Sequence, residues 1–392
     1  MNHAGDLEPT ISERLAQAIA AIEAIDPGDR YDPSVPAALI ASGLHLLCLP
    51  REAGGLGGGL VEAVAVLSAL GAASGSAALG FAMHVHVTGS LYESAGWPPA
   101  LRDWLSELVR DESALLNSAA TEEGSGSPAR GGLPATTATE AGGGYRLTGE
   151  KTWTTWLPAL RAAQVTATVA SGEIGNFVVD LHSRGVERLP GFDALGMRGS
   201  ASGRLVLRDV FVPAERLIGT RPAGGSDPRG PAPGAWFGMA VAAVYLGVGE
   251  GARREVVRWA IDRRPGDGAT AVADLPTIAV RLGRLDAALR SARIVVEEAA
   301  RRWQASAPGD RPALMAEISL AKVTATNAAV QASDEALRIA GGPGFLAGRI
   351  ERAFRDARAG LINPPLDDIA YQSFARRLVD DERARSEGHT RR

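Results

Sequence analysis

The sequence predicts an α+β protein whose chain runs from helices through strands to helices again. Apolar residues recur at helical spacing near the N-terminus and again after residue 275, and short alternating segments lie between them. At 392 residues the chain is too long for one ordinary hydrophobic core. We therefore expect an N-terminal α-helical domain over residues 1–112, a middle β domain over 113–222 and a C-terminal α-helical bundle over 235–392.

The N-terminal domain is predicted from amphipathic periodicity. The segment TISERLAQAIAAIEAI (10–25) has apolar side chains three or four residues apart, as one face of a helix requires. These side chains are Ile11, Leu15, Ile19 and Ile22. The segments LVEAVAVLSALGAAS (60–74) and ALRDWLSELVRD (100–111) behave in the same way. We expect three amphipathic helices here.

The middle domain is predicted from a change in the pattern after about residue 112. Its segments are short, rich in β-branched residues and separated by Gly and Pro, which is typical of strands. They are YRLTGEKTWTT (145–155), QVTATVA (164–170), NFVVDL (176–181) and GRLVLRDVFVP (203–213). The Gly/Pro stretch RPAGGSDPRGPAPGA (221–235) then predicts a linker or loop before the C-terminal part.

The C-terminal bundle is predicted from sustained periodicity between Leu275 and Trp303. The apolar positions are Ile278, Leu282, Leu285, Leu289, Ala292, Val296 and Ala299. The following segment LAKVTATNAAVQAS (320–333) places alanines along a second helix, where small side chains permit close packing.

Composition excludes several classes of function. The net charge of −4 implies no polyanionic partner, so we expect no nucleic-acid binding and no membrane surface. A single cysteine, Cys48, excludes an intramolecular disulfide and fits a reducing compartment. The first ten residues lack the features of a signal peptide, and no uninterrupted apolar run approaches the roughly 20 residues of a membrane span. We expect a cytoplasmic protein, and we predict no metal site.

Several local patterns are weak when each is considered alone. The loop TEEGSGS (121–127) offers backbone N–H groups and hydroxyls to a polar ligand, but a flexible turn has the same composition. RIAGGPGF (338–345) ends a helix with glycines, a normal C-terminal signal. RIERAFRDARAG (349–360) is typical of a helix with an intrachain salt-bridge face.

Taken together and in order, these patterns resemble the acyl-CoA dehydrogenase superfamily of flavoproteins. TEEGSGS is similar to the family's TEPGAGS loop, and LTGEKTWTT (147–155) to its GxKxWIT strand. GMRGSASGRLVLRDVFVP (196–213) and GGPGF with RAFRDARA (352–359) are similar to two further family motifs. The resemblance covers nearly the whole chain. It implies a helical N-terminal domain, a β-barrel-like middle domain and a C-terminal helical bundle.

The resemblance also implies a flavin site, with FAD as the expected cofactor and FMN as the alternative. By resemblance Trp153 lies against the isoalloxazine ring and Thr155 hydrogen-bonds near flavin N5. Thr121 would meet the pyrimidine edge, and Ser127 would face the pyrophosphate or the substrate. An aromatic face shields the ring, and a hydroxyl near N5 steadies the atom through which electrons pass.

Further cofactor contacts are implied across a subunit interface. Arg263 remains from the family's adenine-side segment, which here is RRPG, and Gly341, Gly342 and Gly344 remain from its glycine turn. The Gln that precedes this turn in the family is Arg338 here. The family's assembly implies a homotetramer built as a dimer of dimers, or at least a dimer.

The chain departs from the family at its catalytic base. Most family dehydrogenases use a Glu nine residues after the Arg of the RDA motif, a position that is Pro364 here. A second branch carries a Glu–Arg pair on a helix where this chain has Phe237 and Gly238. If the reaction removes an α-proton, Asp367 or Asp368 must serve as the base. The alternative is that these aspartates cap the next helix.

A different reaction class is suggested by the superfamily's two-component monooxygenases, which take reduced flavin from a reductase and use O2. WFGMAVAAVYLGVGEGA (236–252) and AKVTATNAAV (321–330) are similar to the dibenzothiophene-type enzymes of that branch. His84 and His86 of MHVH are candidates to assist that chemistry, although two helix histidines are more often structural.

Three functional hypotheses therefore remain open. The default is α,β-dehydrogenation of an acyl-CoA, with electrons passed to an electron-transfer partner. The alternatives are a monooxygenase served by a flavin reductase and a non-catalytic flavin-binding protein. Under the two enzymatic hypotheses the substrate is a small molecule whose identity no motif in the sequence determines.

Overall fold

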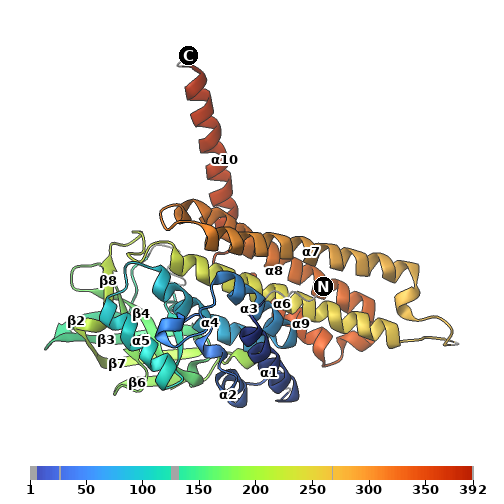
Figure 1. The fold of residues 1–392 in the computed structure, drawn as a ribbon, viewed down its shortest axis with the longest axis horizontal. Helices are drawn as coiled ribbons and strands as arrows, with labels where there is room; N and C mark the ends of the chain where they lie inside the picture. Colours follow the sequence, from blue (N-terminus) through green and yellow to red (C-terminus); the bar gives the residue numbers. More distant parts are fainter. Residues whose placement is uncertain (1–6, 26–27, 125–131, 267, 391–392) are drawn as a thin grey trace.

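The computed structural model describes residues 7–25, 28–124, 132–266 and 268–390, and it has the predicted order of helices, strands and helices (Figure 1). The predicted fold class is confirmed. The helices of the N-terminal domain are α1 (Pro9–Ile25), α2 (Ser34–Ala41), α3 (Leu60–Ala73), α4 (Gly75–Glu93) and α5 (Pro99–Asp111).

Helix α4 packs against both other domains and is buried on nearly every side. All of its residues from Ala77 to Leu91 are buried. A Cβ atom at Gly80 would lie 2.0 Å from the indole of Trp156, and one at Gly89 would lie 2.2 Å from that of Trp236. Only glycine permits this approach, so the end of the middle-domain strand and the start of the long C-terminal helix both pack directly on α4.

The middle domain is one sheet with a mixed strand order. Its strands are β1 (Leu115–Ala119), β2 (Thr137–Ala141), β3 (Gly144–Thr154), β4 (Leu160–Val169), β5 (Ile174–Asp180), β6 (Val186–Leu189), β7 (Gly203–Pro213) and β8 (Leu217–Arg221). They pair in the order β6-β7-β3-β2-β4-β5-β8, and β1 pairs with β4 in parallel. The candidate strand β3 is therefore central, between β7 and β2.

The C-terminal domain is a bundle around the long helix α6. Its helices are α6 (Ala232–Asp262), α7 (Pro276–Ala305), α8 (Met315–Ala340), α9 (Arg349–Ala359) and α10 (Asp367–Thr390). Within the described residues, α6 is long and apolar enough to cross a membrane by length and composition. However, 83% of its apolar window is buried inside the protein, as in the core helix of a bundle.

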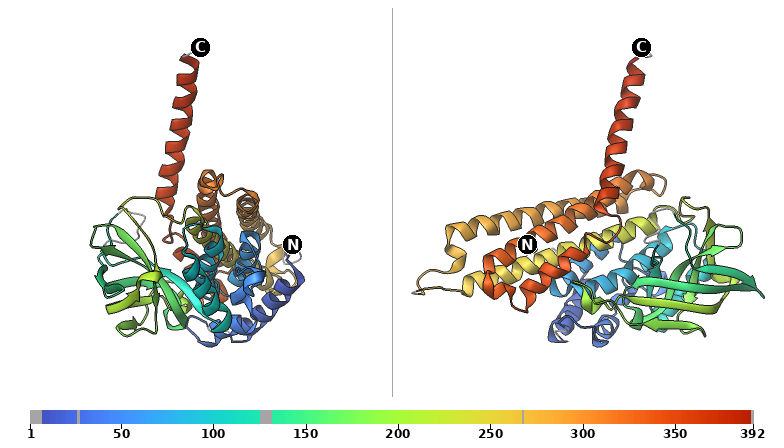
Figure 2. Two further views of the ribbon diagram at one scale, coloured as in Figure 1. Left: turned by 60° about the vertical axis from the view of Figure 1, so that its left-hand side comes forward. Right: turned by 180° about the vertical axis from the view of Figure 1, so that it is seen from behind.

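Helix α10 extends away from the bundle and packs against it only near its first turns (Figures 1 and 2). Isolated helices are marginally stable in water, and most helical stability comes from packing of an apolar face. The exposed apolar side chains of α10 are Ile369, Tyr371, Leu378 and Val379.

One carboxylate joins three helices at the end of the bundle nearest α5. Glu93 Oε2 accepts hydrogen bonds from the indole N–H groups of Trp236 (3.0 Å) and Trp303 (2.9 Å). Arg311 Nη1 donates to the same oxygen at 3.1 Å. Both tryptophans are buried, so without this acceptor their N–H groups lose their partner.

We expect Glu93→Ala to lower the free energy of unfolding by about 2–5 kcal/mol, because two buried N–H donors become unsatisfied. Glu93→Gln keeps an acceptor oxygen and should lose less than half as much. Urea denaturation of the two variants measures the difference. A Glu93→Ala protein as stable as the wild type would show that the indoles find other acceptors.

Candidate active site

The candidate site begins at a bulge in β3. The β3–β7 register shifts between the pairs Lys151–Leu205 and Thr154–Gly203, so β3 carries one extra residue here. Trp153 lies in this bulge with φ of 56°, a left-handed conformation that is uncommon for a bulky residue. Bulges concentrate beside active sites because they redirect a side chain. Here the bulge turns the indole of Trp153 outward, and this side chain is 48% exposed.

A second aromatic ring covers part of this indole. The rings of Trp153 and Phe192 are stacked with centroids 4.3 Å apart and an interplanar angle of 24°. Phe192 belongs to the loop between β6 and β7 and is itself exposed. The two rings form an aromatic surface against which a planar ligand can pack.

A row of hydroxyl groups lies directly after the bulge. Thr155 Oγ1 and Ser202 Oγ are 3.0 Å apart, and Ser202 Oγ and Ser200 Oγ are also 3.0 Å apart. The carbonyl of Thr155 accepts a hydrogen bond from Asn117 Nδ2 at 2.9 Å. Thr154 Oγ1 is buried and has no hydrogen-bond partner in the described part of the chain. Ser200 and Ser202 were missed by the sequence reasoning, although RGSAS showed the hydroxyls at alternate positions.

A buried ion pair lies next to the bulge in the sequence of β3. Lys151 Nζ lies 2.5 Å from Glu122 Oε1, and the two side chains are 0% and 4% exposed. Glu122 also accepts hydrogen bonds from Thr136 and Ala135, which fixes the start of the TEEGSGS loop. Burial opposes ionisation of Glu122, but these donors, Lys151 first, hold its pKa below the ordinary value. Burial likewise lowers the pKa of Lys151.

Thr121 is held at this site by backbone hydrogen bonding. Its carbonyl accepts from the Thr152 N–H at 2.8 Å, so the TEEGSGS loop and β3 are adjacent. The structure therefore brings Thr121, Trp153 and Thr155 together at the end of one strand. Ser127, the fourth predicted contact, lies outside the described residues.

The two candidate histidines differ in their surroundings. His84 Nε2 lies 2.7 Å from the carbonyl of His45, and Leu116 N–H donates to His84 Nδ1 at 3.2 Å. Both ring nitrogens are therefore used, and the ring joins α4 to the 44–46 turn and to β1. Burial lowers the pKa of His84 to about 4. Both ring nitrogens of His84, one of the two predicted catalytic histidines, are thus occupied by contacts within the core.

His86, the second candidate, has an Nδ1 without a partner of normal geometry in the described residues, although the backbone of Ala82 and Met83 interacts with its ring and opposes the lowering of its pKa by burial. Its ring is 5% exposed and lies edge-on to Phe237, with centroids 5.3 Å apart. No described residue makes a hydrogen bond of normal geometry to its Nδ1. Burial, and secondly the charge of Arg229, lower the pKa of His86 to about 4, so the imidazole is neutral. Its ring contacts Phe237, which stands at one of the two positions where the family resemblance implies a carboxylate.

The loop NPPLDD is fastened to the bundle. Asn363 Nδ2 donates to Tyr245 Oη at 2.7 Å. Asp367 accepts from Lys322 Nζ at 3.3 Å and from Asn327 Nδ2 at 2.7 Å. Lys322 is fully buried, and burial lowers its pKa. Both Asp367 oxygens are therefore engaged by α8, and Asp368 is exposed in the first turn of α10.

This geometry also corrects the capping hypothesis. The first backbone bond of α10 runs from Ala370 N–H to the Leu366 carbonyl, so Leu366 is the N-cap residue. Asp367 and Asp368 follow it in the first turn, where negative charge stabilises a helix. Lys322, which neutralises Asp367, lies 45 residues earlier and carried no signal in the sequence.

We expect Asp367→Asn to lower the free energy of unfolding by about 1–3 kcal/mol, because the buried Lys322 loses its charged partner. Asp368→Asn should leave stability unchanged, since that side chain is exposed. Flavin reduction by substrate should be retained in both variants. A loss of turnover on the order of 10²–10⁴ in either variant, with flavin still bound, would instead identify a proton acceptor.

The remaining cofactor candidates lie elsewhere in one subunit. Arg263 directly follows α6, and the glycine turn 341–344 follows α8. These helix ends are at the far end of the bundle from the β domain (Figure 1). A Cβ atom at Gly341 or Gly342 would meet nothing within 4 Å, whereas Gly344 packs on Ala340. The fold of one subunit thus does not bring these residues to Trp153.

A flavin fits the groups that converge at the bulge. The half-exposed indole offers a face to a planar ring, and Thr154 Oγ1 is a buried hydroxyl without a described partner. Thr155 and Ser202 offer further hydroxyls beside it. No group of three or more His, Cys, Asp or Glu side chains that could hold a metal ion occurs among the described residues.

Comparison with protein families gives matches along most of the chain. The model for the N-terminal domain of acyl-CoA dehydrogenase matches residues 7–112, that for the middle domain 117–210, and that for the C-terminal domain 236–378. The protein named "Putative acyl-CoA dehydrogenase YdbM" from Bacillus subtilis is 32% identical over 85% of this chain and 86% of its own length.

Two solved structures share the fold. One is TdsC from Paenibacillus sp. A11-2 in complex with FMN and indole, with a TM-score of 0.80, 22% identity and coverage of 95% of both chains. The other is butyryl-CoA dehydrogenase from Megasphaera elsdenii, with a TM-score of 0.82, 21% identity and coverage of 95% of this chain and 99% of that one. At these identities the likeness concerns the fold alone.

Proposed function

This chain belongs to the acyl-CoA dehydrogenase family of flavoproteins, and from that premise we propose that it is a flavin-dependent monooxygenase that uses O2. Such a reaction needs no carboxylate to remove an α-proton from the substrate. Its reduced flavin, FMN or FAD, would come from a separate flavin reductase. We propose FMN first, because the FMN-bound TdsC has this fold and the adenine-side motif is shortened to Arg263.

The observation that carries this proposal is the state of Asp367. A general base must be unprotonated and within reach of the proton that it takes. Both oxygens of Asp367 are bound by Lys322 and Asn327, which are side chains of α8. The two other positions at which relatives carry the base are Pro364 and Phe237. A neutral imidazole, His86, packs against Phe237 in place of a carboxylate.

The chain's own residues have clear tasks at such a site. Trp153 and Phe192 would cover one face of the ring system, and Thr155 with Ser202 would hold its polar edge. Buried His86 would offer a hydrogen-bonding nitrogen in a region from which water is excluded. Reduced flavin, when bound there, would supply the two electrons that, with two protons, allow one atom of O2 to enter the substrate while the other leaves as water.

The test supplies the purified protein with reduced FMN or FAD, generated by a flavin reductase and NADH, in the presence of isotopically labelled O2. Indole is the first probe because TdsC was solved with it. We expect label in the organic product, detected by mass spectrometry, and no label when the protein is omitted. Rapid anaerobic loss of visible flavin absorbance on adding an acyl-CoA would overturn the proposal.

Acyl-CoA dehydrogenation is the second candidate, and a specific observation favours it. YdbM, at 32% identity, carries the name of an acyl-CoA dehydrogenase, and it is more similar in sequence than the solved monooxygenase TdsC. Under this candidate the electrons leave through an electron-transfer flavoprotein. A panel of butyryl-, octanoyl- and palmitoyl-CoA in the same anaerobic experiment separates the two reactions.

We propose that the protein is a homotetramer built from dimers. In support, Phe345 and Leu346 beside the glycine turn are 77% and 70% exposed, and α10 carries exposed apolar side chains. Such surfaces are typical of protein–protein contact. Light scattering on the flavin-loaded protein should give the mass of four chains or at least of two. A stable flavin-loaded monomer would contradict this.

A further inference from the structure

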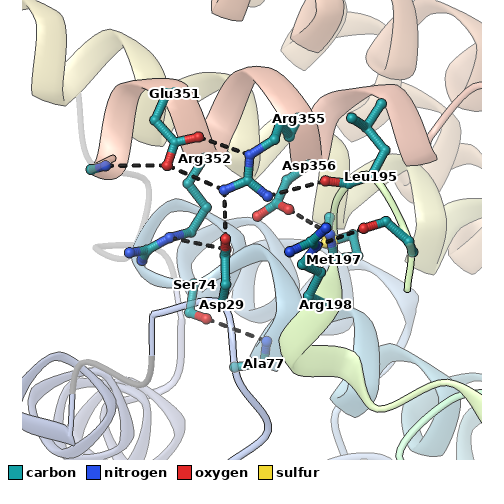
Figure 3. Close-up of polar contacts among 12 residues, drawn as sticks. Asp29, Ser74, Ala77, Leu195, Met197, Arg198, Glu351, Arg352, Arg355 and Asp356 are labelled. Carbon is teal, nitrogen blue, oxygen red and sulfur yellow. Dashed lines mark hydrogen bonds and ion pairs between the residues drawn. The ribbon is translucent and has the colours of Figure 1, made fainter. Parts of the chain in front are cut away.

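The helix α9 contacts both other domains through two adjacent side chains (Figure 3). Arg355 Nη2 donates to Asp29 of the N-terminal domain at 2.6 Å, and its Nη1 donates to the Leu195 carbonyl of the middle domain at 3.0 Å. Asp356 accepts the backbone N–H of Met197 at 2.5 Å. The RDA motif therefore joins three domains.

The contacted segment, residues 195–202, is held in a strained conformation. Met197 and Ala201 have φ values of 55° and 45°, in the left-handed region that costs free energy for residues with a Cβ. Such conformations persist only where the surroundings determine them. A Cβ at Gly196 would lie 2.4 Å from the Arg355 carbonyl, so the segment rests directly on the backbone of α9.

The same segment carries the hydroxyls of the candidate site. Ser200 and Ser202 continue the row that ends at Thr155 Oγ1. The Ser200 carbonyl also accepts the N–H of Trp156 at 2.8 Å, next to Thr155. Met197 is therefore linked, within five residues and through these hydrogen bonds, to the hydroxyls of Ser202 and Thr155.

We propose that Arg355 and Asp356 are positioning residues, which hold segment 195–202 so that Ser202 and Thr155 present their hydroxyls to the flavin. This inference rests on the flavin site of the proposed function but not on which reaction the flavin performs. Neither residue touches the site itself. Both act through the backbone of Leu195 and Met197.

The surroundings of Asp356 shift the pKa of its carboxyl group. Burial raises the pKa of Asp356 to about 6, opposed by the Met197 N–H, and Asp29 raises it further. The charged groups around it are Arg352 and Arg355 on α9, Glu255 on α6 and Arg349 at the start of α9, and the neutral phenol of Tyr245 on α6 is a further titratable neighbour. A cavity of about 50 Å³, lined by Ser74, Ser76, Glu255, Arg352 and Asp356 among others, adjoins the carboxyl. This volume is large enough to hold a water molecule beside polar lining residues.

The pH dependence follows from the direction of this shift. Because the folded protein binds the Asp356 proton more tightly than the unfolded chain, this group adds stability as pH falls through about 6 towards the ordinary value near 4. Asp356→Asn is neutral at all pH values, so this increment should disappear in that variant. Above pH 6 the Asp356 carboxylate of the wild type is charged and buried, and it accepts the hydrogen bond from the Met197 N–H.

The experiment compares Asp356→Ala, which loses the acceptor, with Asp356→Asn, which keeps an acceptor oxygen. Glu250→Ala is the matched control, because it removes a largely buried carboxylate, 13% exposed, that binds Arg293 of α7 and, in the described part of the chain, forms no hydrogen bond or ion pair with segment 195–202. The first readout is hydrogen exchange of the Met197 amide in flavin-free protein. The second is the dissociation constant for FMN and FAD, measured by flavin fluorescence.

We expect Asp356→Ala to speed exchange in segment 195–202 and to weaken flavin binding, each by about 10- to 100-fold, the range that one hydrogen bond to a charged acceptor corresponds to. Asp356→Asn should stay near the wild type in both, and Glu250→Ala should change neither. If Asp356→Ala does not fold, Arg355→Lys carries the test, with faster exchange expected at 195–197.

Unchanged exchange in Asp356→Ala would overturn the inference, and so would a loss of flavin affinity as large in Glu250→Ala. If the wild type itself binds no flavin while the exchange result holds, the proposed function fails, and with it the assigned purpose of the contact. Failure of the proposed reaction with flavin still bound leaves this inference standing.

Discussion

Lys151→Met is expected to lower the free energy of unfolding by about 3–5 kcal/mol, because it leaves the carboxylate of Glu122 buried without its cation. Glu122 is 4% exposed, so solvent cannot replace the lost partner. The effect is a large share of the total stability of a typical protein, which is about 5–15 kcal/mol. Guanidinium denaturation of both proteins measures it.

The double variant Lys151→Met with Glu122→Gln is the control for this prediction. Glutamine removes the unpaired charge and keeps one acceptor oxygen, which can accept from the N–H group of Ala135 or of Thr136. Most of the lost stability should therefore return. If the double variant is as unstable as the single one, the cost comes from packing around Lys151 and not from the charge of Glu122.

Trp153→Ala is expected to weaken flavin binding by about 10- to 100-fold, because the bound ring loses its aromatic neighbour and the apolar area that it covers. Stability without flavin should change little, since the indole is half-exposed and lies in a bulge. Titration of flavin-free protein with FMN and FAD, followed by fluorescence, gives the two affinities.

Trp153→Phe separates this effect from damage to the bulge. Phenylalanine keeps a stacking ring on Phe192, so flavin affinity should fall less than tenfold. Equal flavin content and an unchanged flavin spectrum in Trp153→Ala would show that the indole does not line the cofactor.

The order of domains was predictable because periodicity is a local property. The spacing of Ile11, Leu15 and Ile22 predicted α1, and all three side chains are buried there. The alternation in GRLVLRDVFVP predicted β7 with its correct bounds, Gly203–Pro213. A side chain's burial follows from its place in a regular element, so neighbouring residues carry enough information.

The candidate site was predictable only in part. KTWTT identified the strand, but nothing near it in the sequence showed that Trp153 sits in a bulge or that Phe192, 39 residues later, stacks on it. The two histidines looked alike in MHVH. Only the packing of α4 gave His84 two partners and left His86 Nδ1 without one in the described chain.

The sequence by itself determined the α–β–α order and the position of the strand KTWTT, and it has Pro364 and Phe237 where the family resemblance implies a carboxylate. The tertiary structure decided which polar groups are still available for chemistry. Asp367 is neutralised by Lys322, His84 is used by the core, and Asp356 holds a segment of another domain. The reason is physical: hydrogen bonds and ion pairs of buried groups are satisfied by whatever the fold brings close, which local sequence does not encode.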